Sequence, residues 1–315
     1  MRTSRLLHTL ITTLAFAGTL LAGSTASAQE DVFIHVLGVV QDAGYPQIGC
    51  YAEHCLPGWD DPGLRRGATS IAVVDSAAGE KFLFEATPHL TAQWHELELA
   101  APSSAHEFTG LFLTHAHIGH YAGLMFFGRE AMGASNIPVF AMPRMAEYLS
   151  TNGPWSQLVE LENIAITVMQ ADRANRFSNL SVTPFRVPHR DEYSETVGYR
   201  IEGPRRSALF IPDIDKWDIW QRDIRQLIET VDYALVDGSF FDGNELPGRD
   251  MAQIPHPSVT ESMALFDPLP ATQRAKIWFI HMNHTNPLLD ATSPQHRQVI
   301  EAGYNVAREG DRLPL

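Results

Sequence analysis

The chain has 315 residues, 44% of them hydrophobic and 19% charged, so it can bury a sizeable core and is not a disordered protein. Its 37 acidic residues outnumber 23 basic ones, and its only lysines are Lys81, Lys216 and Lys276, a composition that excludes the basic footprint of a nucleic-acid-binding protein. Two cysteines exclude a disulfide-built scaffold, whereas fourteen histidines indicate metal or acid–base chemistry.

The N-terminal segment has the three parts of a secretory signal peptide. Arg2 and Arg5 are followed by the uncharged, mostly apolar run 6–23 and by a small-residue site that ends at Ala28. We expect cleavage after Ala28 and a periplasmic or secreted mature protein without stable membrane insertion. An uncleaved membrane anchor is the alternative interpretation.

Residues 29–315 contain no repeat or low-complexity linker and predict a single domain. Short apolar runs rich in β-branched residues predict strands at 33–40, 69–75, 82–86, 111–114, 139–141, 180–187, 208–211, 233–236 and 277–280. Helical patterns lie between them at 90–100, 121–132, 216–230 and 295–302, the last one opened by Ser293 and Pro294. This alternation predicts an α/β or α+β fold in which helices cover sheet.

The strongest local motif is a group of three histidines directly after the predicted strand 111–114. His115 and His117 project to the same side of an extended segment, and His120 lies where the chain turns into a helix. Neutral imidazole is a common ligand of divalent metals, so the motif predicts a metal site. Further ligand types follow other predicted strands, namely His189, Asp213 with Asp215, and His281.

Taken in order, these residues resemble the metallo-β-lactamase superfamily, over essentially the whole mature chain. The resemblance implies a four-layer αββα sandwich with one or two metal ions between its sheets, zinc above all, with iron or manganese as alternatives. By motif, the first ion would be held by His115, His117 and His189, the second by His120 and His281, and Asp213 would bridge them. Glu85 falls where the family has a strand-end acid, or is an ordinary loop carboxylate.

One position departs from the family pattern. The usual motif is HxHxDH, and Gly119 stands where its aspartate supplies a ligand to the second metal and takes part in proton transfer. We therefore expect a weaker second site, or one that another acid, such as Asp215 or Glu85, completes.

Within the superfamily, the chain is similar to coenzyme PQQ synthesis protein B (PqqB)-like proteins. The matching segments are 37–38, 42–47, 68–73, 236–241, 248–251 and 280–287. PqqB itself lacks several superfamily ligands that this chain has, and PQQ synthesis is cytoplasmic, so the resemblance implies an exported PqqB-like relative.

The two cysteines lie where PqqB-like proteins and the related phosphodiesterase PhnP carry a structural zinc loop. The resemblance implies a zinc site of Cys50, Cys55, His284 and His54. A Cys50–Cys55 disulfide in an oxidising compartment is the competing interpretation, and two free thiols the third.

We predict an exported metal-dependent hydrolase that uses a metal-bound water on an ester, lactone, phosphodiester or lactam of low molecular weight. Asp213 and His120 would be its catalytic residues. His256 either lines the pocket or is an ordinary loop residue, and Asp237 either supports a metal ligand from behind or is a strand-end turn residue. The alternatives are a PqqB-like iron-dependent oxygenase related to PQQ biosynthesis and a non-catalytic binding protein. Nothing in the sequence indicates a substrate or an oligomeric state.

Overall fold

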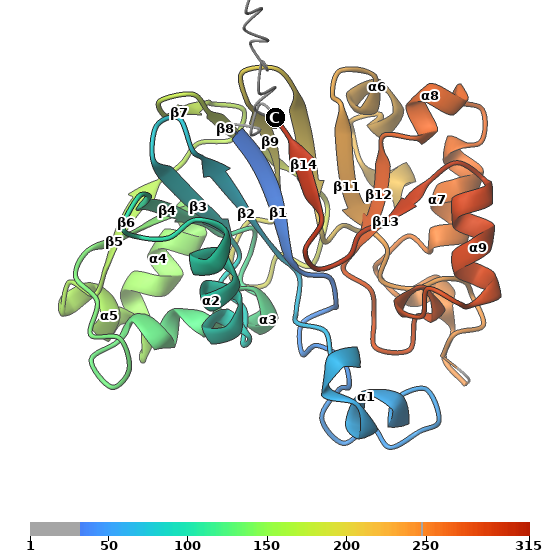
Figure 1. Ribbon diagram of the computed structural model, residues 1–315, viewed down its shortest axis with the longest axis horizontal. Coiled ribbons are helices and arrows are strands. Elements are labelled where there is room, and N and C mark those ends of the chain that lie inside the picture. Colours follow the sequence, from blue (N-terminus) through green and yellow to red (C-terminus); the bar gives the residue numbers. More distant parts are fainter. Residues whose placement is uncertain (1–31, 247) are drawn as a thin grey trace, which may run out of the picture.

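The structure is a computed structural model that describes residues 32–246 and 248–315, so the predicted signal peptide lies outside the described residues. Two seven-stranded sheets stack face to face, with helices on both outer sides (Figure 1). This is the predicted four-layer αββα arrangement in a single domain. Within the described part of the chain, none of the helices has the length and apolarity to cross a membrane.

The strands of the first sheet lie in the order β14-β1-β2-β3-β4-β5-β6 and those of the second in the order β13-β12-β11-β10-β9-β8-β7. The first sheet comprises β14 (Arg312–Pro314), β1 (Val32–Gly38), β2 (Ser70–Asp75), β3 (Glu80–Phe84), β4 (Glu107–Phe112), β5 (Ile137–Ala141) and β6 (Ile164–Val168). The second comprises β13 (Asn305–Val306), β12 (Ile277–Ile280), β11 (Tyr233–Asp237), β10 (Ser207–Ile211), β9 (Val197–Glu202), β8 (Ser181–Arg186) and β7 (Asn175–Arg176).

Helices cover the outer face of each sheet (Figure 1). On the first sheet these are α2 (Leu90–Ala100), α4 (Pro143–Thr151) and α5 (Trp155–Glu160), and on the second α6 (Ile224–Glu229), α7 (Val259–Phe266), α8 (Ala271–Arg274) and α9 (Pro294–Glu301). Two short helices lie outside these layers, α1 (Leu56–Asp60) and α3 (Ile118–Tyr121). Ser293 caps α9 by accepting a hydrogen bond from the His296 amide (3.0 Å), as the sequence predicts.

The core between the sheets follows from the alternation of side chains along each strand. In β3, Phe82 and Phe84 face the second sheet, and Phe84 stacks on Phe112 with ring centroids 4.8 Å apart. Leu83 faces the helices of the first sheet. Lys81, on the same side as Leu83, is completely buried and contacts the Glu98 carboxylate of α2.

Two helix predictions are wrong in extent. Where a helix over 121–132 was expected, the chain forms the end of α3 and a 3-10 helix (Ala122–Phe127), because the Gly123 amide donates to the Ala86 carbonyl (2.8 Å) instead of to an α-helical partner. Within 216–230, α6 begins only after Asp223, whose side chain caps it by accepting from the Arg225 amide (2.9 Å).

The Lys81–Glu98 pair predicts a measurable pH dependence of stability. Burial alone would raise the Glu98 pKa, but hydrogen bonds from Lys81 and Ser103 lower it to about 2. Because the folded-state pKa is depressed, the stabilisation is present above the unfolded pKa of about 4.5 and is lost as the pH falls towards 2. Urea unfolding of Glu98→Gln should therefore show a smaller loss of stability between pH 5 and pH 2.5 than the parent, and equal losses would contradict the assignment.

Candidate metal centre

The predicted ligands come from loops that follow strands of both sheets and meet at one end of the sandwich. His115 and His117 follow β4, His189 follows β8, Asp213 follows β10, and His281 follows β12. Strands β8 and β10 both pair antiparallel with β9, and β10 to β12 are parallel, so their carboxyl ends lie at the same edge of the second sheet. The fold therefore gathers residues that lie up to 166 positions apart in the printed sequence.

The first group consists of His115, His117, His189 and Asp213, whose ligand atoms all lie within 4.8 Å of one another. Asp213 is at its centre, with Oδ2 3.3 Å from His115 Nε2 and Oδ1 3.2 Å from His189 Nε2. His117 Nδ1 lies 2.8 Å from His115 Nε2 and 3.3 Å from His189 Nε2. Three imidazoles and a carboxylate at this spacing form a donor set suited to zinc.

The second group consists of His120, on α3, together with His281 and Asp42. His120 Nε2 lies 3.6 Å from Asp213 Oδ2, so Asp213 also joins the two groups. The facing atoms of this group, Asp42 Oδ1, His120 Nε2 and His281 Nε2, are buried and form no hydrogen bond of good geometry within the described residues. Buried polar atoms that converge without partners are costly, and a bound cation would satisfy all of them, so the residues present fit a metal ion.

In each of the five candidate ligand histidines, the ring nitrogen that points away from the other ligands lies near an oxygen atom. His115 Nδ1 lies 2.8 Å from Thr114 Oγ1, and His281 Nδ1 lies 3.0 Å from Ser239 Oγ. Further pairs are His117 Nε2 with Glu192 Oε2 (3.1 Å), His189 Nδ1 with Asp215 Oδ1 (3.3 Å) and His120 Nδ1 with Glu85 Oε2 (3.5 Å). Partners of this kind fix the ring orientation and tautomer of metal-ligating histidines.

This arrangement corrects the expected role of Glu85 and Asp215. Neither of them faces the second group, since each lies behind a histidine ring. Glu85 is fully buried, accepts a hydrogen bond from the Thr114 amide (3.2 Å) and has a positive φ of 76°. These two acids orient His120 and His189 and do not stand in for the aspartate that Gly119 replaces.

The sequence leaves open whether His256 lines the pocket or is an ordinary loop residue. In the structure it lies within the candidate metal centre. Its Nδ1 atom is 2.8 Å from Asp237 Oδ2 and 3.3 Å from Asp213 Oδ1, and the residue is buried. Asp237 in turn accepts from the Ile214 and Ser239 amides (3.2 and 2.8 Å). His256 follows a loop with no regular pattern, so no local signal in the sequence marks it.

The electrostatics of the metal-free centre follow from burial and from opposite charges. Burial alone would raise the Asp213 pKa, but the charges of His189 and His256 hold it well below its usual range. Burial lowers the His115 pKa well below its usual range, which keeps this imidazole in the neutral form that binds metal. For His120, burial is outweighed by Glu85 and Asp42, and its pKa is raised well above the usual range. A metal ion would displace that proton on binding.

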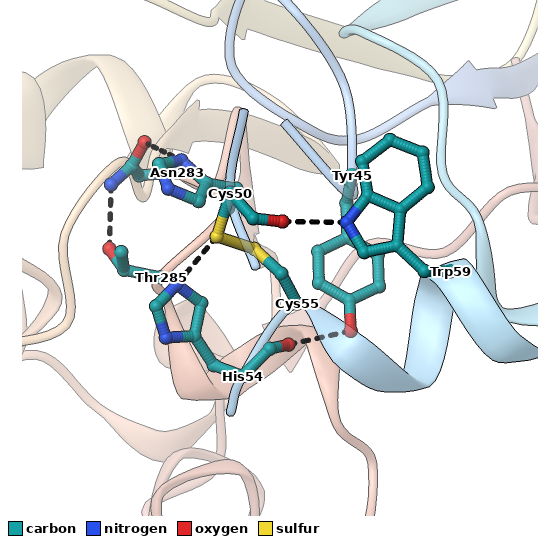
Figure 2. The surroundings of a disulfide bond; sticks show 8 residues. Tyr45, Cys50, His54, Cys55, Trp59, Asn283 and Thr285 are labelled. Carbon is teal, nitrogen blue, oxygen red and sulfur yellow. Dashed lines mark hydrogen bonds between the residues drawn. A yellow bond between two sulfur atoms is a disulfide. The ribbon is translucent and has the colours of Figure 1, made fainter. Parts of the chain in front are cut away.

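Cys50 and Cys55 lie in the loop that contains α1, apart from the two groups of metal ligands (Figure 2). Of the alternatives in the sequence, the structure has the Cys50–Cys55 disulfide. His54 Nε2 lies 3.4 Å from Cys50 Sγ, and its ring centroid lies 5.6 Å from that of His284. The ligand atoms of all four residues lie within 4.8 Å of one another, so the predicted zinc ligands are adjacent even in the disulfide form.

The fold and the metal centre define a class, and comparison with known proteins agrees with it. Residues 80–282 match the model of the β-lactamase superfamily domain, and the chain belongs to this superfamily. Within it, the chain is similar to coenzyme PQQ synthesis protein B. It is 27% identical to that protein from Methylococcus capsulatus, over 90% of this chain and 100% of the relative, and 26% identical to that from Azotobacter vinelandii, over 90% and 99%.

Solved structures share the fold. Zn²⁺-bound PqqB from Methylobacterium extorquens superposes with a TM-score of 0.73 at 23% identity, covering 90% of this chain and 100% of that one. A diphosphatase of the PhnP family has a TM-score of 0.64 at 21% identity and covers 90% and 96%.

Proposed function

We propose that this chain is a PqqB-like metalloenzyme that acts on a small molecule at two adjacent metal centres. The observation that carries the proposal is the position of Asp213. One of its oxygens faces His189 (3.2 Å) and the other faces His115 and His120 (3.3 and 3.6 Å). A single buried carboxylate therefore lies between two groups of histidines, as a bridging ligand does.

The two-centre geometry favours hydrolysis of an ester, lactone, phosphodiester or lactam. Divalent metal bound at these residues would supply Lewis acidity and a water of lowered pKa. Asp213 is placed to orient a water between the two groups. His256 is held by Asp237 at 2.8 Å, lies 3.3 Å from Asp213 Oδ1, and can donate a proton to a leaving group.

The residues that line the cavity beside His256 indicate which charge we expect on the substrate. A cavity of about 480 Å³ is lined by His256, Arg190, Arg249 and Phe240, among other residues. Two guanidinium groups in an acidic protein favour a substrate that carries a carboxylate or phosphate group, and the phenyl ring favours an apolar portion.

A second candidate is supported by the relatives. Proteins named for coenzyme PQQ synthesis match 90% of this chain, which favours a PqqB-like role in PQQ biosynthesis more than it favours any one hydrolysed substrate. We propose iron-dependent oxygenation as the reaction of this candidate. Histidines with a carboxylate suit Fe(II) as well as Zn(II).

Elemental analysis after parallel aerobic and anaerobic purification separates the two reactions. Zinc or manganese together with turnover of an anionic ester, lactone, phosphodiester or lactam would support hydrolysis. Iron bound only in the anaerobic preparation, together with O₂ consumption, would support oxygenation and contradict hydrolysis. His117→Ala should abolish either activity, and unchanged metal content and activity in this variant would contradict both.

We also propose that the chain is exported and cleaved after Ala28. The basic start, apolar run and small-residue site support this location, and so does a cysteine pair that an oxidising compartment would keep as a disulfide. N-terminal sequencing of the protein from fractionated cells should find Gln29 first in the periplasm or medium. An intact Met1 in the cytoplasm would contradict the proposal.

The cysteine cluster predicts zinc binding that depends on reduction. The oxidised protein should bind no zinc at Cys50 and Cys55, because zinc requires thiolates. Treatment with a phosphine reductant should add one zinc ion per chain, measured by a colorimetric chelator. The increase should be absent in Cys55→Ser, while His95→Ala, a histidine outside the cluster, serves as the control.

A further inference from the structure

Asp42 occupies the space that a side chain at position 119 would need. A Cβ atom added at Gly119 would lie 2.5 Å from Asp42 Cα and 2.6 Å from both Asp42 Cβ and Asp42 Oδ1. A side chain at position 119 is therefore incompatible with Asp42 in its present place. The carboxylate that the histidine motif lacks is replaced in space by a carboxylate from the loop after β1.

The Asp42 carboxylate faces the second group of histidines. Its Oδ1 atom lies 3.2 Å from His120 Nε2 and 4.0 Å from His281 Nε2. The side chain is 45% exposed overall, but Oδ1 is buried and has no hydrogen-bond partner in the described chain, as is also true of the two facing nitrogens. One oxygen and two nitrogens thus lie within 4.8 Å of one another, which is the arrangement of a ligand set.

The backbone holds Asp42 in this position. Asp42 has a positive φ of 33°, a conformation that a residue other than glycine adopts only when its surroundings impose it. On one side, the Gln41 amide donates to the Met282 carbonyl (2.8 Å), which ties the loop to the residue after His281. On the other side, the Gly44 amide donates to the Gln41 carbonyl (3.1 Å) and closes the turn.

We propose that Asp42 is the carboxylate ligand of the second metal ion, together with His120 and His281, in place of the aspartate that Gly119 replaces. This inference rests on the proposed metalloenzyme function and deepens it. It makes the second centre complete, and it brings a ligand from the N-terminal loop next to ligands from α3 and from the loop after β12. Gly119 is then required because its lack of a side chain leaves room for Asp42.

The first test measures metal binding and not turnover, so it is independent of whether a substrate is found. Metal-free protein with its disulfide intact, verified by the absence of free thiols, is titrated with Zn²⁺ in a calorimeter. The parent should bind two ions per chain. Asp42→Ala should keep the first and bind the second about 100-fold more weakly or not at all. Asp60→Asn, a carboxylate in the same N-terminal region on exposed α1, should match the parent.

A second variant excludes loss of folding as the cause. In the double variant Asp42→Gly with Gly119→Asp, the carboxylate moves to the motif position and the steric conflict disappears. Second-ion binding should recover to within about tenfold of the parent, whereas Gly119→Asp alone should lose it. Two ions bound with parental affinity by Asp42→Ala would overturn the inference. Loss of turnover without loss of the second ion would count against the proposed reaction instead.

Discussion

Replacing Asp213 with asparagine should remove metal from both centres and lower turnover by more than about 100-fold. Loss of a residue that only hydrogen-bonds to a metal ligand typically costs about 10-fold to 100-fold, and Asp213 should exceed this range because it binds the metal itself. The substitution keeps the shape of the side chain and deletes the charge. Four imidazoles face this carboxylate, those of His115, His120, His189 and His256, at 3.2 to 3.6 Å. Without the charge, two cations and their histidines would lie together without a bridging anion.

The matched control is Asp215→Asn. The Asp215 carboxylate faces the outer nitrogen of His189 (3.3 Å), and its side chain is 22% exposed. Its replacement should weaken metal binding about 10-fold to 100-fold and leave both ions measurable by mass spectrometry at saturating metal. An Asp213→Asn protein that retains two ions and parental turnover would show that Asp213 is not the bridge.

Replacing Lys81 with alanine should lower the free energy of unfolding by about 3 kcal/mol, at the lower end of the range for a broken buried ion pair. Lys81 is fully buried in β3, and its Nζ donates to Glu98, to the Ala101 carbonyl (2.9 Å) and to Ser103 Oγ (2.9 Å). The Glu98 side chain is 29% exposed, so water can replace part of the lost interaction.

Two variants make this measurement specific. Lys81→Met keeps most of the buried volume, so its difference from Lys81→Ala measures packing apart from charge. Arg129→Ala removes an ion pair with Glu130 in which both side chains are more than half exposed, and it should leave the free energy of unfolding close to that of the parent. Equal losses for Arg129→Ala and Lys81→Ala would contradict the ion-pair argument.

The sequence predicts those parts of the fold that repeat a local pattern. The helix α2 and most strands with apolar runs lie where the pattern places them, although β6 was not predicted and β4 begins earlier than predicted. Strand β9 was not predicted because polar Arg200 and Glu202 interrupt its apolar run. Strands β13 and β14 were not predicted because two or three residues are too few to show a periodic pattern. The 3-10 helix after α3 is set by a contact with a distant loop at Ala86, which no local rule contains.

The candidate site divides in the same way. The histidine motif and the residues at strand ends are visible in the sequence because ligand types follow apolar runs. Asp42 could not be chosen over Glu85 and Asp215, since all three are acids near strand ends and only the packing of the Gly119 backbone distinguishes them. A residue absent from a motif therefore indicates where to look for its substitute, namely in a chain segment that would clash with the missing side chain.

The position of Asp42 at the start of the domain and of His281 near its end has a thermodynamic consequence. An ion held by both residues joins the ends of a long stretch of chain, as a crosslink would, and the unfolded state has no such site. At a free ion concentration of 100 times its dissociation constant, a ligand that binds only the native state adds about 2.7 kcal/mol to stability. With an ion bound at these residues, the melting temperature would rise with the free metal concentration around the protein.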